Sequence, residues 1–400
     1  MKYLSILCLL AILSSTPFAF AEQPPVVFQM QPADLLAAKE RWLAHEPMAV
    51  AGVRSIIHEA NSALTAGPYA LVHKEHPLPG VDPHEYVSLA PYFWPNPDTK
   101  NGLPYVRHDG QRNPEIREYD ARPFGEMSGH VKSLAMGYYF TGDERYAARA
   151  TLLIRTWFLD PATRMNPDLQ HAQLVKGVND GRGTGIIESI RLIDVLDSVG
   201  MLQGSKSWTS EDQDGIHRWM SDYVKWMHDS KNGQAEEAAT NNHGCWYDVQ
   251  YTAFNLFLGR PDAARETAES AKEHRIAQQI QPDGTLPREL ARTNSFGYCT
   301  FCLSAMTELA DLGKRVDVDL WSFKTKDGRS IELAINWMLP YVTGQERWKH
   351  QQISKYAPAS FLTILHRAYR ATHDPAYEKV IAHLREMSNS DTGSFLTPEE

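Results

Sequence analysis

The chain has 400 residues, of which 42% are hydrophobic and 22% are charged, a composition typical of a folded globular protein. Its formal net charge is −9, and it has no Lys/Arg-rich run that would neutralise phosphates, which argues against nucleic acid as a partner. An acidic total does not exclude an anionic ligand, because such a ligand responds to the charges that line its own site.

The first 21 residues have the pattern of a secretory signal peptide. Lys2 precedes the apolar run YLSILCLLAILSS, and AFA, ending at Ala21, supplies small residues for cleavage. The run is too short to cross a bilayer, and no later segment reaches about 18 apolar residues. We therefore expect a mature protein without a membrane span that is periplasmic or secreted.

Most of the remaining chain has the periodicity of amphipathic helices, with apolar residues at three- and four-residue steps. The stretch 129–160 predicts two helices that are separated at Thr141-Gly142-Asp143. Almost no segment alternates with a period of two for long enough to form a sheet. The expected fold is therefore all-α, with further helices at about 33–45, 48–65, 186–199, 211–230, 241–258, 261–281, 296–312, 329–342, 358–371 and 375–388.

A weak internal repeat indicates how the helices are arranged. The stretches 138–150, 255–268 and 368–381 each combine the end of one helix, a short polar turn and a new helix. Helical hairpins that stack and close on themselves form a toroid whose inner helices line a central cleft. We therefore expect residues 22–400 to form a single (α/α) toroid, or incomplete α/α barrel, with long loops lining its cleft.

Two connections are long for a compact domain and rich in proline or glycine. Residues 90–116 include five prolines and the aromatic stretch PYFWP, and residues 160–185 include NDGRGTG. The second has neither a P-loop pattern nor a dinucleotide-binding fingerprint, so we expect no nucleotide site. Loops of this length are often functional. We expect both to line the cleft, where Asn179 and Arg182 either face a ligand or cap the next helix.

The cysteines do not indicate a disulfide framework. Cys8 leaves with the signal peptide, and Cys245, Cys299 and Cys302 are an odd number, so at least one thiol stays unpaired. We interpret them as small apolar core residues. The chain has no H-E-x-x-H motif, no second cysteine pair and no G-x-S-x-G motif, so we expect no metal, no cofactor and no serine nucleophile.

One predicted helix starts with an unusual group of side chains. In the stretch AATNNHGCWYDVQ, Asn241, Asn242, His243 and Trp246 fall within two helical turns. The free N–H groups at a helix start favour an anion, so these side chains could bind one there. Alternatively, Thr240 or Asn241 caps the helix while His243 and Trp246 pack inside.

A second polar cluster lies about fifty residues further along, in LPRELARTNSFGYC. Arg288, Arg292 and Tyr298 beside an apolar helix suit a carboxylated ligand, although Arg288 and Glu289 could instead pair with neighbouring helices. Together the clusters supply His, Tyr, Asn and Arg. Removing a proton next to a carboxylate requires a neutralised carboxylate, a base and an acid for the leaving oxygen. These are the requirements of a β-eliminating polysaccharide lyase.

The same residues resemble a known family. NNHGCWYDVQ is similar to the Asn-Asn-His-x-x-Trp signature of helical-toroid alginate lyases and related uronate lyases. YFWPNPDTKNGLPYVRHDGQRNPE and TRMNPDLQHAQLVKGVNDGRGTGIIES resemble two further stretches of the alginate lyase domain, and the similarity covers about residues 85–345. It implies cleavage of a 1,4-linked mannuronate (alginate) or glucuronate (glucuronan) polymer by β-elimination, which leaves 4,5-unsaturated ends.

The resemblance also implies roles for individual residues. Asn242 would help to neutralise the uronate carboxylate, His243 would assist or act as the base, Arg292 would stabilise the acidic group, and Tyr298 would transfer the proton. Arg292 and Tyr298 stand one residue closer together than their counterparts in alginate lyases. We expect further substrate contacts from Asn241, Trp246, Trp94, His171, Gln173, Asn179, Arg182, Glu236 and Arg288.

The configuration of the sugar limits the proton transfers. In β-D-mannuronate and β-D-glucuronate the C5 hydrogen and the C4 oxygen lie on one face, so a single tyrosine can act as base and then as acid. In α-L-guluronate they lie on opposite faces, and two groups are needed. A tyrosine base must work below its usual pKa of about 10. We expect Arg292 or a protonated histidine to favour the Tyr298 phenolate.

Two other classes of protein are alternatives. A glycoside hydrolase on the same toroid would need two carboxylates about 5–9.5 Å apart. A periplasmic oligosaccharide-binding protein would need no His–Tyr pair beside an arginine. The carboxylates available to a hydrolase are those of Asp180, Glu188, Glu236, Asp248 and Glu289.

Overall fold

The structure is a computed structural model that describes residues 24–388, so the predicted signal peptide and Cys8 lie outside the described residues. The described chain is mainly helical, which confirms the predicted all-α fold. No helix within this range is long and apolar enough to span a membrane.

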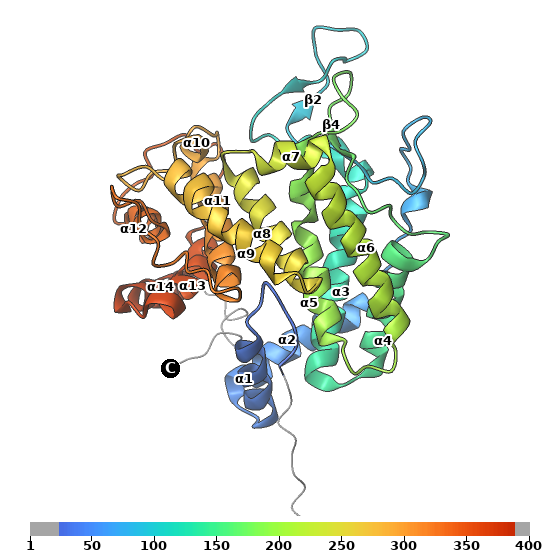
Figure 1. The fold of residues 1–400 in the computed structure, drawn as a ribbon, viewed down its shortest axis with the longest axis horizontal. Helices are drawn as coiled ribbons and strands as arrows, with labels where there is room; N and C mark the ends of the chain where they lie inside the picture. The colour runs from blue at the N-terminus through green and yellow to red at the C-terminus, as the bar shows by residue number, and fades with distance from the viewer. Residues whose placement is uncertain (1–23, 389–400) are drawn as a thin grey trace, which may run out of the picture.

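The helices are arranged as hairpins in an incomplete (α/α) toroid (Figure 1). Four of them form a central row: α3 (Ala121–Thr141) packs against α5 (Arg191–Met201), α5 against α8 (Asn242–Phe257), and α8 against α11 (Ser295–Lys314). The other α-helices flank this row directly or through a neighbour: α1 (Pro32–Leu43), α2 (Pro47–Ala63), α4 (Glu144–Ile154), α6 (Ser210–Asp229), α7 (Lys231–Glu237), α9 (Pro261–Ala271), α10 (Pro287–Leu290), α12 (Ile331–Val342), α13 (Leu362–Thr372) and α14 (Pro375–Ser388).

The three repeated stretches are helical corners, as predicted. They join α3 to α4, α8 to α9, and α13 to α14, and the two helices of each pair pack together. At the first corner Gly142 has a φ of 70°, the left-handed conformation that commonly ends a helix. Asp143 then caps α4 by accepting a hydrogen bond from the backbone N–H of Arg145. Local turn chemistry therefore defines this hairpin.

Some helix boundaries differ from the predictions. α3 begins at Ala121 rather than near residue 129, and the helix predicted from residue 186 begins as a 3-10 segment at Gly183–Ile190. Hydrophobic periodicity alone does not distinguish an α-helix from its tighter or wider variants. Short segments of these variants also occur at Leu71–His73, Pro114–Glu118 and Pro358–Phe361 (3-10), and at Arg155–Leu159 and Lys272–Ala277 (π).

Short strands lie in the two long connections and just before the first of them, and the sequence analysis did not predict them. β1 (Val87–Leu89) pairs in parallel with β4 (His171–Leu174), and β2 (Phe93–Trp94) pairs antiparallel with β3 (Val106–Arg107). Strands of this length are too short for a period-two pattern to be visible. In Figure 1, β2 and β4 lie at the same end of the molecule as α7 and α10, so the long connections gather at that end.

The N-terminal segment is fastened to the central row. The buried carboxylate of Asp197, on α5, accepts hydrogen bonds from the backbone N–H groups of residues 28–30. Arg315, just after α11, donates to the carbonyl of Val27. Val27 belongs to a hydrophobic cluster that continues through the chain to Leu384. One buried carboxylate therefore ties the start of the described chain to the core.

The pH dependence of stability should report on this carboxylate. Burial raises the pKa of Asp197 to about 7, although its backbone donors lower it. The folded protein thus binds this proton more tightly than the unfolded chain, so the stability that it contributes is complete below about pH 4 and is lost as the pH rises through about 7. Between about pH 5 and about pH 8, we expect the free energy of unfolding to fall by about 1–3 kcal/mol more in the wild type than in Asp197→Asn.

Urea denaturation at the two pH values measures this difference. Asp262→Asn is the matched control, because the Asp262 side chain is 94% exposed and should leave the pH dependence unchanged. Equal pH dependence in the wild type and in Asp197→Asn would contradict the prediction.

Candidate active site

Two side chains of the protein itself accept hydrogen bonds from the backbone N–H groups at the start of α8. Asn241 is the N-cap residue, and its Oδ1 accepts a hydrogen bond of 3.3 Å from the His243 N–H. The Glu289 carboxylate accepts hydrogen bonds from the Asn242 backbone N–H (2.6 Å) and from Asn242 Nδ2 (2.8 Å). The capping that we considered is therefore present. The anion expected at this helix start is present too, but it is Glu289 from α10.

Glu289 also links the two polar clusters. Burial raises the pKa of Glu289, whereas its hydrogen bonds with Asn242 and the charges of Arg292 and His243 lower it. Glu289 belongs to the second cluster and Asn242 to the first, so their hydrogen bonds join the two clusters directly. The site of the first cluster and that of the second are one site.

Asn242 is almost fully enclosed in this site. Its residue exposure is 1%, and one Nδ2 hydrogen is used by Glu289. Within residues 24–388, its Oδ1 has no hydrogen-bond partner. A contact between Asn242 and a substrate carboxylate stays a prediction, and it would use the second Nδ2 hydrogen.

His243 is oriented by a buried carboxylate. Its Nδ1 lies 2.6 Å from Oε1 of Glu236, near the end of α7; the side chains of His243 and Glu236 are 18% and 1% exposed. An ionised Glu236 places the hydrogen on Nδ1 and leaves Nε2 of a neutral imidazole free to accept a proton. We had predicted that Glu236 contacts the substrate, but its burial makes it a positioning residue for His243 instead.

The Tyr298 hydroxyl is hydrogen-bonded to Arg292 and to Tyr92, which come from different parts of the chain. Nη2 of Arg292 donates a 2.6 Å hydrogen bond to the Tyr298 hydroxyl, and the guanidinium lies 3.7 Å from the centre of the Tyr298 ring. The Tyr298 hydroxyl donates in turn to the hydroxyl of Tyr92, at 2.8 Å. The Asp109 carboxylate fixes Arg292 by accepting hydrogen bonds from Nη2 (2.6 Å) and Nε (3.1 Å). The predicted pair of Arg292 and Tyr298 therefore exists, and it is assembled with the long connection 90–116.

Sequence analysis missed Tyr92 and Asp109. Both lie in the connection that we expected to line the site, but only Trp94 was chosen from it. Polar and aromatic residues are common in such loops, and nothing in their spacing indicates that they meet Arg292. The only available signal was the unusual length and aromatic content of the loop itself.

Arg292 favours the Tyr298 phenolate, as expected, but other effects outweigh it and the net pKa of Tyr298 is raised. Burial raises the pKa of Tyr298, and the neighbouring Tyr92 raises it further, whereas Arg292 lowers it to a smaller extent. Burial also opposes ionisation of Asp109, but hydrogen bonds from Arg292 and Thr293 hold its pKa well below the usual range. Burial and Tyr92 outweigh the charge of Arg292, and the Asp109 charge adds to their effect, so Tyr298 keeps its proton.

The guanidinium of Arg182 is held by uncharged groups. Its Nε and Nη2 donate to the carbonyl and to Oε1 of Gln173, at 3.0 and 2.9 Å, and its guanidinium lies 5.2 Å from the centre of the Phe93 ring. Gln173 is buried and has a φ of 49°, a strained conformation for this residue. In the part of the chain that the structure describes, Arg182 forms no ion pair. This arrangement suits binding of an anionic group, and the predicted substrate contacts of Arg182 and Gln173 stay predictions.

Two other predicted contacts belong to the same connections. Trp94 is half-buried, and its Nε1 donates to the Gln111 carbonyl at 2.9 Å. His171 lies beside the Asp180 carbonyl, with 2.9 Å between Nδ1 and that oxygen. Both side chains are partly accessible and remain candidates for contacts with sugar.

Three further predicted contacts are placed differently. Asn179 accepts backbone N–H groups of its own loop through Oδ1, so it shapes that loop and does not cap the following helix. Trp246 is 5% exposed and its ring lies 5.0 Å from that of Phe301, so it is a core residue and cannot stack on a sugar here. Arg288 is exposed on α10.

Most of the carboxylates that a hydrolase could use are already hydrogen-bonded to other groups of the protein. Asp248 is held by Arg275 through hydrogen bonds of 2.7 and 2.9 Å, and Glu188 accepts from the hydroxyls of Tyr86 and Ser88, at 2.7 Å each. Glu236 and Glu289 are bound to His243 and Asn242, as described above. Asp180 is exposed. The arrangement therefore gives no pair of carboxylates that is free to act on water and a glycosidic oxygen.

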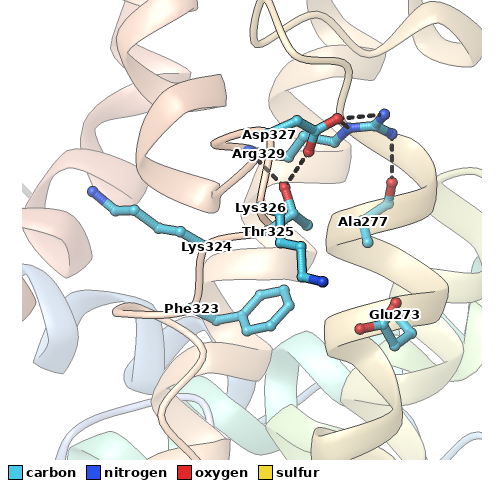
Figure 2. Close-up of a pocket in the computed structure, with 8 residues that line it drawn as sticks. All are labelled: Glu273, Ala277, Phe323, Lys324, Thr325, Lys326, Asp327 and Arg329. Carbon is cyan, nitrogen blue, oxygen red and sulfur yellow. Dashed lines mark hydrogen bonds and ion pairs between the residues drawn. The ribbon is translucent and has the colours of Figure 1, made fainter.

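A pocket of about 550 Å³ lies elsewhere, between the loop 323–329 and the segment that contains Glu273 (Figure 2). Arg329 in this pocket already donates to Asp327 and to the carbonyl of Ala277. None of its lining residues belongs to the site around His243 and Tyr298. The pocket therefore has no place in the chemistry of that site.

Comparison with known proteins identifies similar sequences and folds. The sequence profile of the alginate lyase family matches residues 71–348. The crystal structure of an alginate lyase from Bacteroides ovatus is 35% identical, with a TM-score of 0.90 over 94% of this chain and 100% of that chain. Two tetrasaccharide complexes of alginate lyase A1-III, a histidine-to-alanine and a tyrosine-to-phenylalanine variant, are each 14% identical. Their TM-scores are 0.53 and 0.54, over 81% and 87% of this chain and 88% and 94% of theirs, which shows a shared fold. No curated protein sequence matched the chain.

Replacing Glu236 should show whether it positions His243. In Glu236→Gln the amide can donate as well as accept, so it no longer enforces one tautomer of the imidazole. We expect kcat on the polysaccharide substrate to fall by about 100-fold, with little change in KM. Initial rates measure both constants. Glu237→Gln, at the neighbouring exposed position, should behave as the wild type, and equal rates for the two variants would contradict the assignment.

Proposed function

Because the chain belongs to the alginate lyase family and is a polysaccharide lyase, we propose that it cleaves 1,4-linked uronate polymers by β-elimination. Mannuronate-rich alginate is the first candidate substrate, and glucuronan is the second. The observation that carries the proposal is that Glu289 joins two groups by its hydrogen bonds with Asn242. Asn242 precedes the oriented imidazole of His243. Glu289 lies three residues before Arg292, which donates to Tyr298.

Arg182 and Arg292 supply the positive charge that the reaction needs. A uronate carboxylate must be neutralised before the neighbouring C5 proton becomes acidic enough to remove. Arg182 is held by Gln173 without an ionic partner among residues 24–388, whereas Arg292 is ion-paired with Asp109 through Nε and Nη2. Their guanidinium groups can therefore bind the carboxylate and stabilise the charge that develops on it.

His243 and Tyr298 are suited to different proton transfers. The neutral imidazole of His243 presents Nε2 to accept the C5 proton, because Nδ1 faces Glu236. Tyr298 keeps its proton, because burial and Tyr92 raise its pKa, and it is therefore suited to donate to the leaving O4. The C5–H and C4–O bonds break, a C4=C5 double bond forms, and the polymer is cut. A separate base and acid do not require both bonds to lie on one face of the sugar.

Export remains part of the proposal. The pattern of the first 21 residues predicts a periplasmic or secreted enzyme, which would meet such polymers outside the cytoplasm. A hydrolase and an oligosaccharide-binding protein are the competing functions. The hydrogen-bonded carboxylates argue against the first, and the oriented imidazole argues against the second.

A substrate panel tests the proposed function. The mature protein is incubated with polymannuronate, polyguluronate, glucuronan and a neutral β-glucan, and the ultraviolet absorbance of the conjugated double bond is followed. We expect absorbance to rise on polymannuronate or glucuronan and not on the β-glucan. New reducing ends without absorbance would instead indicate hydrolysis.

Tyr298→Phe should separate chemistry from binding. The variant keeps the ring beside Arg292 but has no proton to give to O4. We expect kcat to fall by about 10²–10⁴-fold, while the Kd for a tetrasaccharide substrate changes by less than about threefold. Absorbance assays and calorimetric titration measure the two effects. Tyr251→Phe, further along α8, is the control, and full activity of Tyr298→Phe would refute the role.

A further inference from the structure

Three buried cysteines remain outside the proposed chemistry: Cys245, Cys299 and Cys302. Cys245 is on α8 and the other two are on α11, and these two helices carry His243 and Tyr298. We propose that Cys245 and Cys302 form a disulfide that joins α8 to α11 when the protein matures in an oxidising compartment. The proposal goes beyond the lyase activity and depends on the predicted export.

The two sulfur atoms are already in contact. Sγ of Cys245 and Sγ of Cys302 are 3.8 Å apart, and the residues are 1% and 0% exposed. Both thiols face Oε1 of Gln279, at 3.3 and 3.7 Å. A disulfide requires a separation of about 2.05 Å, so the sulfurs must approach by about 2 Å. Small rotations about the two Cα–Cβ bonds within the packed pair of helices can supply that movement.

Helix geometry disfavours a disulfide between Cys299 and Cys302. Cys299 and Cys302 form a C-x-x-C on α11, where residues three apart have Cβ atoms about 5–6 Å apart. A disulfide needs Cβ atoms about 3.5–4.5 Å apart. Cys302 should therefore pair across the helix interface, and Cys299 should remain a thiol.

The oxidation requires an external disulfide. Cys245 and Cys302 each lose a proton and an electron, the new S–S bond forms, and a disulfide oxidant such as oxidised glutathione or a thiol–disulfide oxidoreductase is reduced to thiols. In the folded protein the hydrogen bond with Cys245 and burial raise the pKa of the Cys302 thiol, which slows exchange. The bond should thus form during folding, before the interface closes.

The cross-link would act on the site through the helices that carry it. Cys245 lies two residues after His243, and Cys302 lies four residues after Tyr298. A covalent bond between them restricts separation of the base and the acid. It also closes a long loop of chain, which stabilises the folded state.

Mapping of thiols in the wild type tests the proposal directly. The protein is exported to the periplasm of a bacterial host, denatured, and alkylated with N-ethylmaleimide before any reduction. We expect one modified cysteine, Cys299, a mass lower by two hydrogens, and a linked peptide pair containing Cys245 and Cys302. Cys299→Ala should keep the linked pair and lose the modification. Three modified cysteines, or a Cys299–Cys302 link, would overturn the proposal.

Thermal unfolding of the same samples gives a second readout. We expect reduction with dithiothreitol to lower Tm by several degrees in the wild type and in Cys299→Ala, and to leave Tm of Cys302→Ala unchanged. An unchanged Tm of the wild type on reduction would count against the cross-link. Neither measurement uses a substrate, so either result can be read whether or not the chain proves to cleave uronates.

Discussion

The site depends on the hydrogen bonds between the buried carboxylate of Glu289 and Asn242. The carboxylate accepts the backbone N–H and the side-chain Nδ2 of Asn242, and it lies within the influence of both Arg292 and His243. A buried carboxylate is costly unless hydrogen bonds and nearby positive charge compensate for lost water. Here the hydrogen bonds from Asn242 at the start of α8 and the charge of Arg292 provide that compensation. The same hydrogen bonds that compensate the charge of Glu289 therefore also hold α8 against α10, which directly precedes α11.

The other charges of the site follow the same pattern of pairing between elements. Glu236 near the end of α7 orients His243 on α8, and Asp109, after β3, fixes Arg292 before α11. Each partner comes from a different segment, so no single helix carries the chemistry. The long connections therefore do more than cover the toroid, because one of them supplies Asp109 and Tyr92.

Residue type and periodicity were sufficient to predict the helical toroid and the two polar clusters. The helical corners at Gly142 and its two counterparts depend on local turn chemistry, which a sequence displays directly. The joining of His243 and Tyr298 into one site could also be predicted, because the family resemblance includes both motifs. These features are determined by short stretches of chain or by a shared fold.

Features that depend on distant contacts could not be predicted. Trp246 and Glu236 were expected at the substrate, but helix packing buries both. Tyr92 and Asp109 meet Tyr298 and Arg292 only because the connection 90–116 folds over α11. The direction of the Tyr298 pKa depends on burial and on Tyr92, neither of which a one-dimensional pattern contains.

The central claim is that His243 removes the C5 proton and Tyr298 protonates the leaving O4 in the same elimination. The most direct measurement is a crystal structure of Tyr298→Phe with a bound mannuronate tetrasaccharide. The account predicts that C5 of one sugar lies within about 3.5 Å of Nε2 of His243. It also predicts O4 beside the substituted ring and the carboxylate on Arg182 or Arg292. A glycosidic oxygen held between two carboxylates, with C5 far from His243, would contradict it.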